Sequence, residues 1–234
     1  MKLLSLAMTE MSDYQSGASG KIYSLAIEIS DLENRVAEMH RVITDTSWLS
    51  PLDIIDQVTY EARAKPTIDK VVNDILANVE SNISEEFGEY MVSDSAQTAL
   101  HQHLEHIRAP LAELIKEKVS GNPGFDFHTV SPDSIVAFGE AKFSGVKNAH
   151  GRALEQINRF IDDKKDVQEL SDLRRFFHES AVINAAQGKK SYSAAFSITS
   201  KNVQQVMDNA LKSKFIPSLL EYQAVYLIGV KVSA

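Results

Sequence analysis

Two charged residues, Glu140 and Lys142, stand at the end of a segment that is otherwise apolar. The preceding residues, 135–138, read IVAF and have the composition of a strand that is covered on both faces. Because alternate residues of a strand point to the same side, Glu140 and Lys142 are expected to share one face. Charged side chains are rarely buried unless they are paired or bind a metal. The spacing therefore indicates either a structural ion pair, the commoner arrangement for an isolated pair of this kind, or a chemical site.

Further carboxylates occur in segments that a fold can bring to this strand end. Asp126 lies inside an apolar FDF stretch, and Glu86 and Glu89 lie in a predicted short helix. Each has a plain interpretation, Asp126 as a residue flanking a turn and the two glutamates as acids favoured at a helix N-terminus. Carboxylate and carbonyl oxygens are also the ligands of Mg²⁺. Together with Glu140, these acids are candidates for one chemical site.

A third set of polar residues follows on the helix predicted for residues 148–163. Arg152, Gln156 and Arg159 recur at helical spacing and form one polar face opposite an apolar stripe. An ordinary solvated helix face is the simplest interpretation. If the chain binds nucleic acid, Arg152 and Arg159 are the candidate phosphate contacts.

The order of these elements resembles the PD-(D/E)XK nuclease superfamily. Asp126 matches the family's motif Asp, and the stretch from Glu140 to Lys142 matches its (D/E)-x-K motif. The stretch from Gln156 to Phe160 is similar to the Gln-x-x-x-Tyr motif of RecB-type nucleases, with Phe in the place of Tyr. The chain also departs from the family at Phe125, where the family has Pro. The resemblance covers residues 84–160 and a late strand.

The resemblance implies a metal-dependent nuclease. Asp126, Glu140, Glu89 and the backbone carbonyl of Ala141 would bind Mg²⁺ or Mn²⁺, with Glu86 as a less favoured substitute for Glu89. Lys142 would position or activate water. Catalytic roles would fall to these residues and to Gln156, which would orient the site.

At finer grain, GFDF and FGEAKF in a helix-rich chain look like the nuclease subunit of the Hachiman antiphage system. Such subunits resemble the domain of unknown function numbered 1837 and act beside a superfamily 2 helicase. The implied partners are DNA and a helicase, in a complex that defends against phage.

The segments that must position these residues predict an α/β protein. Strands are expected near residues 21–29, 125–130, 135–143 and 222–232, the middle two as a hairpin, and helices are expected over most of the remainder, with residues 191–200 left ambiguous. Asp31 is a candidate N-cap for a helix over residues 31–43. Pro66 is expected to begin a new helix that runs to about residue 83, and residues 84–92 to form a short one of their own. Residues 95–119 are expected to form one or two helices, bent near Pro110. We expect a PD-(D/E)XK-type core with a small mixed sheet flanked by helices. Residues 1–80 would form a mostly helical lobe, and residues 81–234 the core, with a helical insertion at about 163–215.

Composition narrows the possible functions. The chain has 234 residues and no cysteine, which excludes disulfides and thiolate metal sites and fits a reducing cytoplasm. No apolar run is long enough for a membrane span. The net charge is −8, and residues 1–120 hold 10 basic against 20 acidic residues. An acidic protein attracts nucleic acid poorly, so we expect a partner to deliver it.

Two other site types are not expected. His101, His103 and His106 lack the i, i+4 spacing of a helical zinc pair. QGKKS, residues 187–191, lacks the leading glycine of a phosphate-binding loop. Two alternatives to a nuclease remain open: a non-catalytic interaction subunit with a degenerate nuclease-like fold, and an enzyme of another chemistry.

Overall fold

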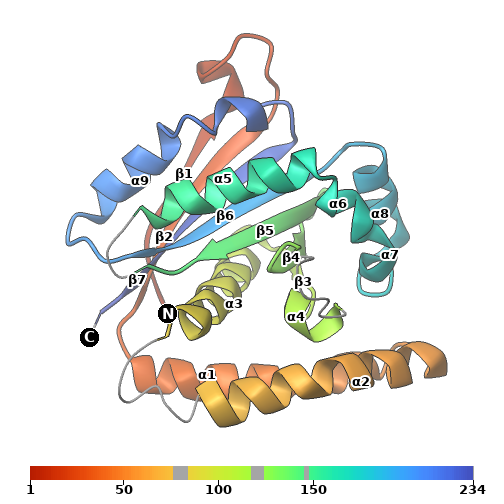
Figure 1. Ribbon diagram of the computed structural model, residues 1–234. Helices are drawn as coiled ribbons and strands as arrows, with labels where there is room; N and C mark the ends of the chain where they lie inside the picture. The colour runs from red at the N-terminus through yellow and green to blue at the C-terminus, as the bar shows by residue number, and fades with distance from the viewer. Residues whose placement is uncertain (76–83, 117–123, 145–147, 234) are drawn as a thin grey trace.

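The computed structural model describes residues 1–75, 84–116, 124–144 and 148–233. Within them one seven-stranded sheet has the strand order β1-β2-β7-β6-β5-β4-β3 (Figure 1). The strands are β1 Lys2–Glu10, β2 Lys21–Ile29, β3 Ile107–Arg108, β4 Phe127–Val130, β5 Val136–Lys142, β6 Ser191–Ile198 and β7 Ala224–Val232.

The middle of the sheet is parallel and its two sides are antiparallel. Strands β2, β7, β6 and β5 run parallel to one another, whereas β1 pairs antiparallel with β2, and β4 pairs antiparallel with both β5 and β3. Parallel neighbours need crossover connections, which the helices between β5, β6 and β7 provide. The expected α/β class, with a mixed sheet flanked by helices, is therefore confirmed.

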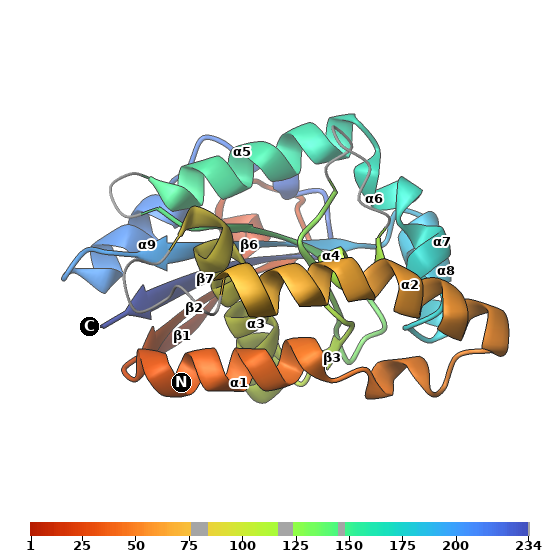
Figure 2. The ribbon, with the colours of Figure 1, turned by 60° about the horizontal axis from the view of Figure 1, so that its bottom comes forward.

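Helices cover both faces of the sheet (Figure 1, Figure 2). On one face lie α5 Ala149–Asp162 and α9 Val203–Leu211, and on the other lie α3 Glu85–Leu104, α1 Leu32–Thr44 and α2 Ile54–Lys70. The shorter helices are α4 Ala112–Ile115, α6 Lys165–Gln168, α7 Leu170–Leu173 and α8 Glu179–Ala186. The remaining turns of helix are η1 Met11–Asp13, η2 Ser47–Leu49, η3 Val71–Ile75 and η5 Pro217–Leu219.

Two apolar cores result, one on each face of the sheet. The face under α5 contains Phe138, Tyr192 and Phe196, and the face under α3 contains Tyr226 and Phe127. Every residue of β5 is buried, including its two charged residues. This explains why β5 and β7 read as nearly continuous apolar runs, since both of their faces are covered.

Several sequence predictions are confirmed. β2, β5 and β7 match three of the expected strands, and β4 forms the expected hairpin with β5. Asp31 caps α1, because its carboxylate accepts a hydrogen bond from the backbone N–H of Asn34. The ambiguous residues 191–200 contain β6, which lies in the centre of the sheet.

Three helix predictions are wrong. Pro66 lies inside α2 instead of beginning a new helix, and the predicted stop of that new helix near residue 83 lies outside the described residues. The expected short helix of residues 84–92 continues without a break to Leu104, where Glu105 adopts a left-handed backbone conformation (φ 56°) and ends it. The bend expected near Pro110 is instead a strand, β3, followed by the single turn of α4.

The predicted domain boundary at residue 80 falls in the stretch 76–83, outside the described residues. The first eighty residues supply α1 and α2, but also β1 and β2, which pair into the common sheet through nine β2–β7 residue pairs. The expected helical insertion at 163–215 likewise contains β6. The sheet is therefore larger than the small one expected.

In the described part of the chain, no helix has both the length and the apolar character needed to cross a lipid bilayer.

Candidate functional site

The carboxyl end of β5 brings Glu140 and Lys142 together. The Lys142 Nζ lies 2.8 Å from Glu140 Oε1. Glu140 has no exposed surface, and Lys142 is 8% exposed. Apart from this contact with Lys142, neither carboxylate oxygen of Glu140 has a hydrogen-bond partner within the described residues. The ammonium group of Lys142 is therefore the counter-charge of a carboxylate that the fold has otherwise left unsatisfied, which is a costly arrangement in a protein interior.

Glu89 completes the surroundings of Lys142 from the other layer. Its Oε1 lies 3.2 Å from Lys142 Nζ. The first turn of α3 can approach β5 this closely because residue 88 is glycine: a Cβ there would lie 2.1 Å from the ring of Phe143. Glu86 points elsewhere and pairs with Lys70, 2.5 Å away. Of the two candidate helix acids, the structure thus brings Glu89 into the cluster.

Asp126 lies just before β4 and extends the hairpin. Its backbone N–H donates to the carbonyl of Gly139, and its Oδ2 accepts from the N–H of Ala141, both at 2.8 Å. The side chain of Asp126 therefore reaches the backbone between Glu140 and Lys142. In an extended strand the N–H and C=O of one residue point to the same side, so the Ala141 carbonyl also faces Asp126.

The electrostatics of the cluster favour added positive charge. Burial raises the pKa of Asp126 to about 6, although Lys142 and the Ala141 N–H act against this. Burial and the neighbouring Asp126 also raise the pKa of Glu140 well above its usual value. Burial alone would lower the pKa of Lys142, but Glu140 and Asp126 outweigh it and raise the pKa. One ammonium group therefore faces three carboxyl groups.

The donor set fits a hard divalent cation. Glu140 offers two buried oxygens that have no partner besides Lys142, Asp126 adds a carboxylate, and the Ala141 carbonyl is on the same side. In the described ranges no group of three or more His, Asp or Glu side chains is placed so that it could hold a metal ion. Lys142 instead pairs with both Glu140 and Glu89. The residue types thus suit Mg²⁺ or Mn²⁺, but an ion would have to share Glu140 with Lys142, which occupies this position in the structure.

The α5 residues lie beside this cluster to different extents. Arg152 is exposed and its Nη2 pairs with Glu85 Oε1 at 2.9 Å, which joins α5 to the start of α3 at the same end of the sheet. Gln156 is half-buried and makes no hydrogen bond within the described residues. Arg159 is exposed and its guanidinium lies 5.6 Å from the ring centroid of Phe160. It is about 10 Å further along the helix than Arg152.

A supporting network behind Asp126 was not predicted from sequence. One carboxylate oxygen of Glu169, Oε1, accepts a hydrogen bond from the backbone N–H of Phe125 at 2.9 Å and lies 2.5 Å from Lys116 Nζ. The other oxygen, Oε2, lies 2.6 Å from His128 Nε2. Lys116 also donates to the Phe125 carbonyl at 2.6 Å. The network fixes the backbone immediately before Asp126. No sequence signal links these residues, because they come from separate segments.

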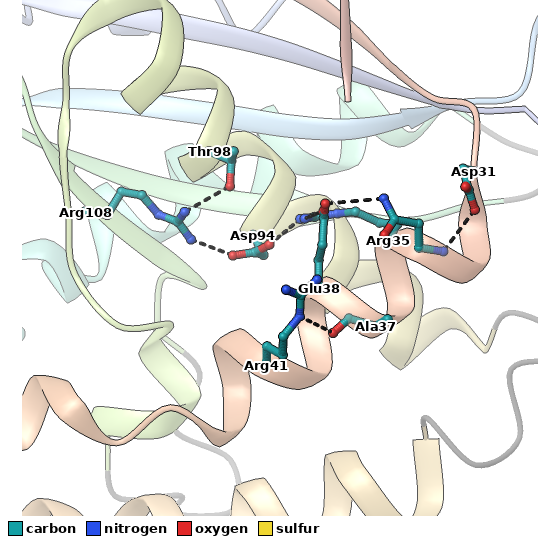
Figure 3. Close-up of polar contacts among 9 residues, drawn as sticks. Asp31, Arg35, Ala37, Glu38, Arg41, Asp94, Thr98 and Arg108 are labelled. Atoms are coloured by element: carbon teal, nitrogen blue, oxygen red, sulfur yellow. Dashed lines mark hydrogen bonds and ion pairs between the residues drawn. The ribbon is translucent and has the colours of Figure 1, made fainter.

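A second unpredicted cluster anchors α3 (Figure 3). The buried carboxylate of Asp94 pairs with Arg35 of α1 and, at 2.6 Å, with Arg108 of β3. Arg108 also donates to the Thr98 hydroxyl at 3.0 Å. Because both arginines share one carboxylate of α3, they tie that helix to α1 and to the edge of the sheet. Glu89 lies on the same helix, five residues before Asp94.

Comparisons with protein-family models, with curated proteins and with solved structures found no significant match to this chain. The chemical interpretation of the cluster accordingly depends on its own geometry.

Proposed function

We propose that this chain is a metal-dependent nuclease of the PD-(D/E)XK type that hydrolyses DNA phosphodiester bonds. The observation that carries the proposal is the carboxylate of Glu140, which is fully buried beside Asp126 and has no partner besides Lys142 within the described residues. A core that needed only a packed strand would not contain three carboxyl groups around one ammonium group. Strongly perturbed carboxyl groups that share a partner are typical of catalytic sites.

The roles follow from the positions of the side chains. Asp126 and Glu140 would hold Mg²⁺ or Mn²⁺, with the Ala141 carbonyl and Glu89 as further oxygen ligands. When bound, such an ion supplies Lewis-acid stabilisation of the phosphoryl oxygens and lowers the pKa of water. Lys142 would donate a hydrogen bond to the attacking water or to the phosphate, where negative charge develops.

Residues of α5 would contact the substrate. Arg152 lies at the same end of the sheet as Lys142 and would pair with the DNA backbone after releasing Glu85. Arg159 would contact a phosphate further along the helix. Gln156 has a half-buried amide whose hydrogen-bonding groups would orient the site or the DNA backbone.

A protein partner fits the charge of the chain and one of its surfaces. The net charge of −8 disfavours capture of DNA by the chain alone. The start of α2 exposes Ile54, Ile55 and Val58, with Ile55 75% exposed. Apolar side chains grouped in this way are typical of an interaction surface. We propose that this surface, called the α2 patch below, docks a superfamily 2 helicase in a cytoplasmic antiphage complex.

The same observations allow a second candidate, a non-catalytic interaction subunit. In that case Lys142 is the permanent counter-charge of Glu140 and Glu89, and only the α2 patch is functional. The two candidates differ in divalent-ion binding, which only a nuclease of this type requires.

Plasmid degradation tests the proposal. The natural chain and the variants Glu140→Gln and Lys142→Met are each assayed alone and together with the protein encoded beside the gene. Each assay is run in Mg²⁺, in Mn²⁺ and in EDTA. We expect cutting that EDTA abolishes and that falls at least a hundredfold in both variants. The matched control is Lys231→Met, because Lys231 pairs with Glu28 at 2.9 Å between β7 and β2, away from the cluster. No cutting under any condition, with no heat of Mg²⁺ or Mn²⁺ binding, would favour the interaction subunit.

A further inference from the structure

A cavity of about 450 Å³ lies at the end of the sheet opposite to the Glu140–Lys142 cluster. Its floor is formed where β6 and β7 begin, at Ser191 and Ala224. Ser191 pairs in register with Ala137 of β5, which is five residues before Lys142, so the two sites are about 16 Å apart along the strands. Small-molecule sites in proteins have volumes of about 300–1,000 Å³. The cavity is therefore large enough for a ligand and separate from the proposed nuclease site.

The cavity exists because α3 stops before it reaches the start of these strands. The helix ends at Leu104, which lines the cavity, and Glu105 turns the chain away with its left-handed backbone conformation. The floor residues Ser191 and Ala224 are small, so their side chains leave the space beyond the helix end unfilled.

One wall of the cavity is aromatic. The rings of Tyr23 and Tyr226 stack with their centroids 5.2 Å apart, and the His106 ring meets Tyr226 edge to face at 4.9 Å. Burial lowers the pKa of His106 to about 4, so the imidazole is neutral at pH 7. Its Nδ1 lies 2.9 Å from the Thr129 hydroxyl, and within the described residues its Nε2 makes no hydrogen bond. The wall thus offers ring surface and a neutral hydrogen-bonding group.

Polar side chains at the cavity lack partners. Ser191 is 1% exposed, and its hydroxyl makes no hydrogen bond to any described residue. A buried hydroxyl of this kind is costly unless another molecule satisfies it. Lys21 and Asp133 are exposed, and in the described ranges neither side chain forms an ion pair. Burial, Tyr23 and Asp133 raise the pKa of Tyr226, so the Asp133 carboxylate lies near the aromatic wall.

The two unpaired charges stand on opposite sides of the cavity. Lys21 begins β2, and Asp133 lies in the turn before β5. Strands β6 and β7 lie between β5 and β2, a separation of three strand spacings, or about 14 Å (Figure 1). A compact zwitterion such as a free amino acid has its two charges on neighbouring groups and is too short for this separation. The cavity instead suits a ligand with an anion at one end and N–H donors at the other.

A guanine mononucleotide has these features. Its phosphate is an anion that a lysine ammonium group binds as a point charge. At its other end, the adjacent N1–H and N2–H groups of guanine match the two acceptor oxygens of a carboxylate. Its flat base suits an aromatic wall. Among the residues that line the cavity, Lys21 is the only basic one besides the neutral His106, so the further phosphates of a triphosphate or a strand would have no counter-charge.

We propose that this cavity binds a free guanine mononucleotide, with its phosphate at Lys21 and the edge of its base at Asp133. Ser191 and His106 would form hydrogen bonds with the polar groups between these two ends. The ligand would bind too far from Lys142 to be the substrate of the nuclease site, and it would stabilise the folded chain. The proposal does not depend on nuclease activity.

Isothermal titration calorimetry with GMP tests the site. The natural protein should bind GMP at least tenfold more tightly than guanosine, which lacks the phosphate. It should also bind GMP at least tenfold more tightly than AMP, whose base edge has an acceptor beside its amino group. No heat at millimolar GMP, or the lack of either preference, would overturn the proposal.

Two variants assign the ends of the ligand. Lys21→Met should weaken GMP binding at least tenfold and leave guanosine binding unchanged. Asp133→Asn has an amide with one acceptor and one donor, so it should lose the preference for GMP over AMP. The matched controls, Lys212→Met and Asp162→Asn, change exposed residues of α5 and the end of α9, on the other face of the sheet, and should bind GMP normally. Unchanged GMP binding by Lys21→Met and Asp133→Asn would show that the nucleotide does not bind in this cavity.

Discussion

Lys142 on β5 and Glu89 on α3 form an ion pair of 3.2 Å, although they belong to different layers of the fold. The contact exists because the glycine at position 88 lets the first turn of α3 approach the end of β5. Glu140, on the same strand as Lys142, shares the ammonium group at 2.8 Å. The cluster is therefore assembled across the end of the sheet and depends on the exact placement of α3.

Removing the ammonium group should destabilise the protein as well as inactivate it. Lys142→Met leaves Glu140 buried without a counter-charge, which we expect to lower the free energy of unfolding by about 3–5 kcal/mol at neutral pH. Lys231→Met removes a partly exposed pair with Glu28 and should cost about 1 kcal/mol or less. Urea denaturation measures both.

The same variant has a defined pH dependence. The pKa of Glu140 is raised in the folded protein by burial, so the folded state binds a proton more readily than the unfolded state. The ionised carboxylate is therefore what destabilises the Lys142→Met protein, and the destabilisation should shrink as the pH falls towards the usual pKa of a glutamate, 4.5. A loss of stability that is constant from pH 7 to pH 4.5 would contradict this account.

The approach of α3 to β5 can be tested at Gly88. A Cβ at this position would lie 2.1 Å from the Phe143 ring, so Gly88→Ala should push the first turn of α3 outward and separate Glu89 from Lys142. We expect a loss of stability of about 1–3 kcal/mol and at least a tenfold loss of plasmid cleavage.

A second substitution provides the control for Gly88. Phe143→Ala removes the ring that the new methyl group would strike, so the double variant should cleave faster than Gly88→Ala alone. If the double variant is no better, the loss does not arise from this contact.

His106 should contribute to acid sensitivity. Burial lowers its pKa from 6.5 to about 4, and its Nδ1 lies 2.9 Å from the Thr129 hydroxyl. Between these two pH values the unfolded chain binds the proton and the folded chain does not, so stability falls as the pH falls. The contribution, about 3 kcal/mol, should be fully present above pH 6.5 and lost by about pH 4.

A comparison with His106→Asn isolates the pH-dependent contribution of His106 to stability, because asparagine keeps a hydrogen-bond partner for Thr129 but does not titrate. The difference in unfolding free energy between the natural protein and the variant should change between pH 6.5 and pH 4. A difference that stays flat over this range would exclude His106 as a source of acid sensitivity.

The α2 patch should bind a partner without supporting the fold. Ile55→Asp changes a side chain that is 75% exposed, so the free energy of unfolding should change by no more than about 0.5 kcal/mol. Binding to the proposed helicase partner, measured by calorimetry, should weaken at least tenfold. Val167→Asp, at an exposed apolar position on α6, is the control and should bind normally. Equal binding by both variants would place the docking surface elsewhere.

The sequence by itself determined the local elements of this protein. Alternation and apolar runs predicted β2, β5 and β7, because a strand covered on both faces must be apolar along its length. Asp31 predicted the start of α1, since its carboxylate satisfies a free N–H there. Glu140 and Lys142, at the end of the apolar β5 segment, are an exception to this apolar pattern that the sequence alone reveals. Asp126 is a similar exception inside the apolar FDF stretch, and these exceptions marked the candidate site.

The tertiary structure decided which residues meet. It brought Glu89, and not Glu86, to Lys142, because the close approach of Gly88 to Phe143 and the pairs of Asp94 with Arg35 and Arg108 hold α3 in place. It placed β6 in the centre of the sheet although residues 191–200 have an ambiguous pattern, because small residues such as Ala194 and Ala195 fit between the covering helices. The buried network of Glu169, Lys116 and His128 depends on long-range packing, which no local sequence pattern encodes.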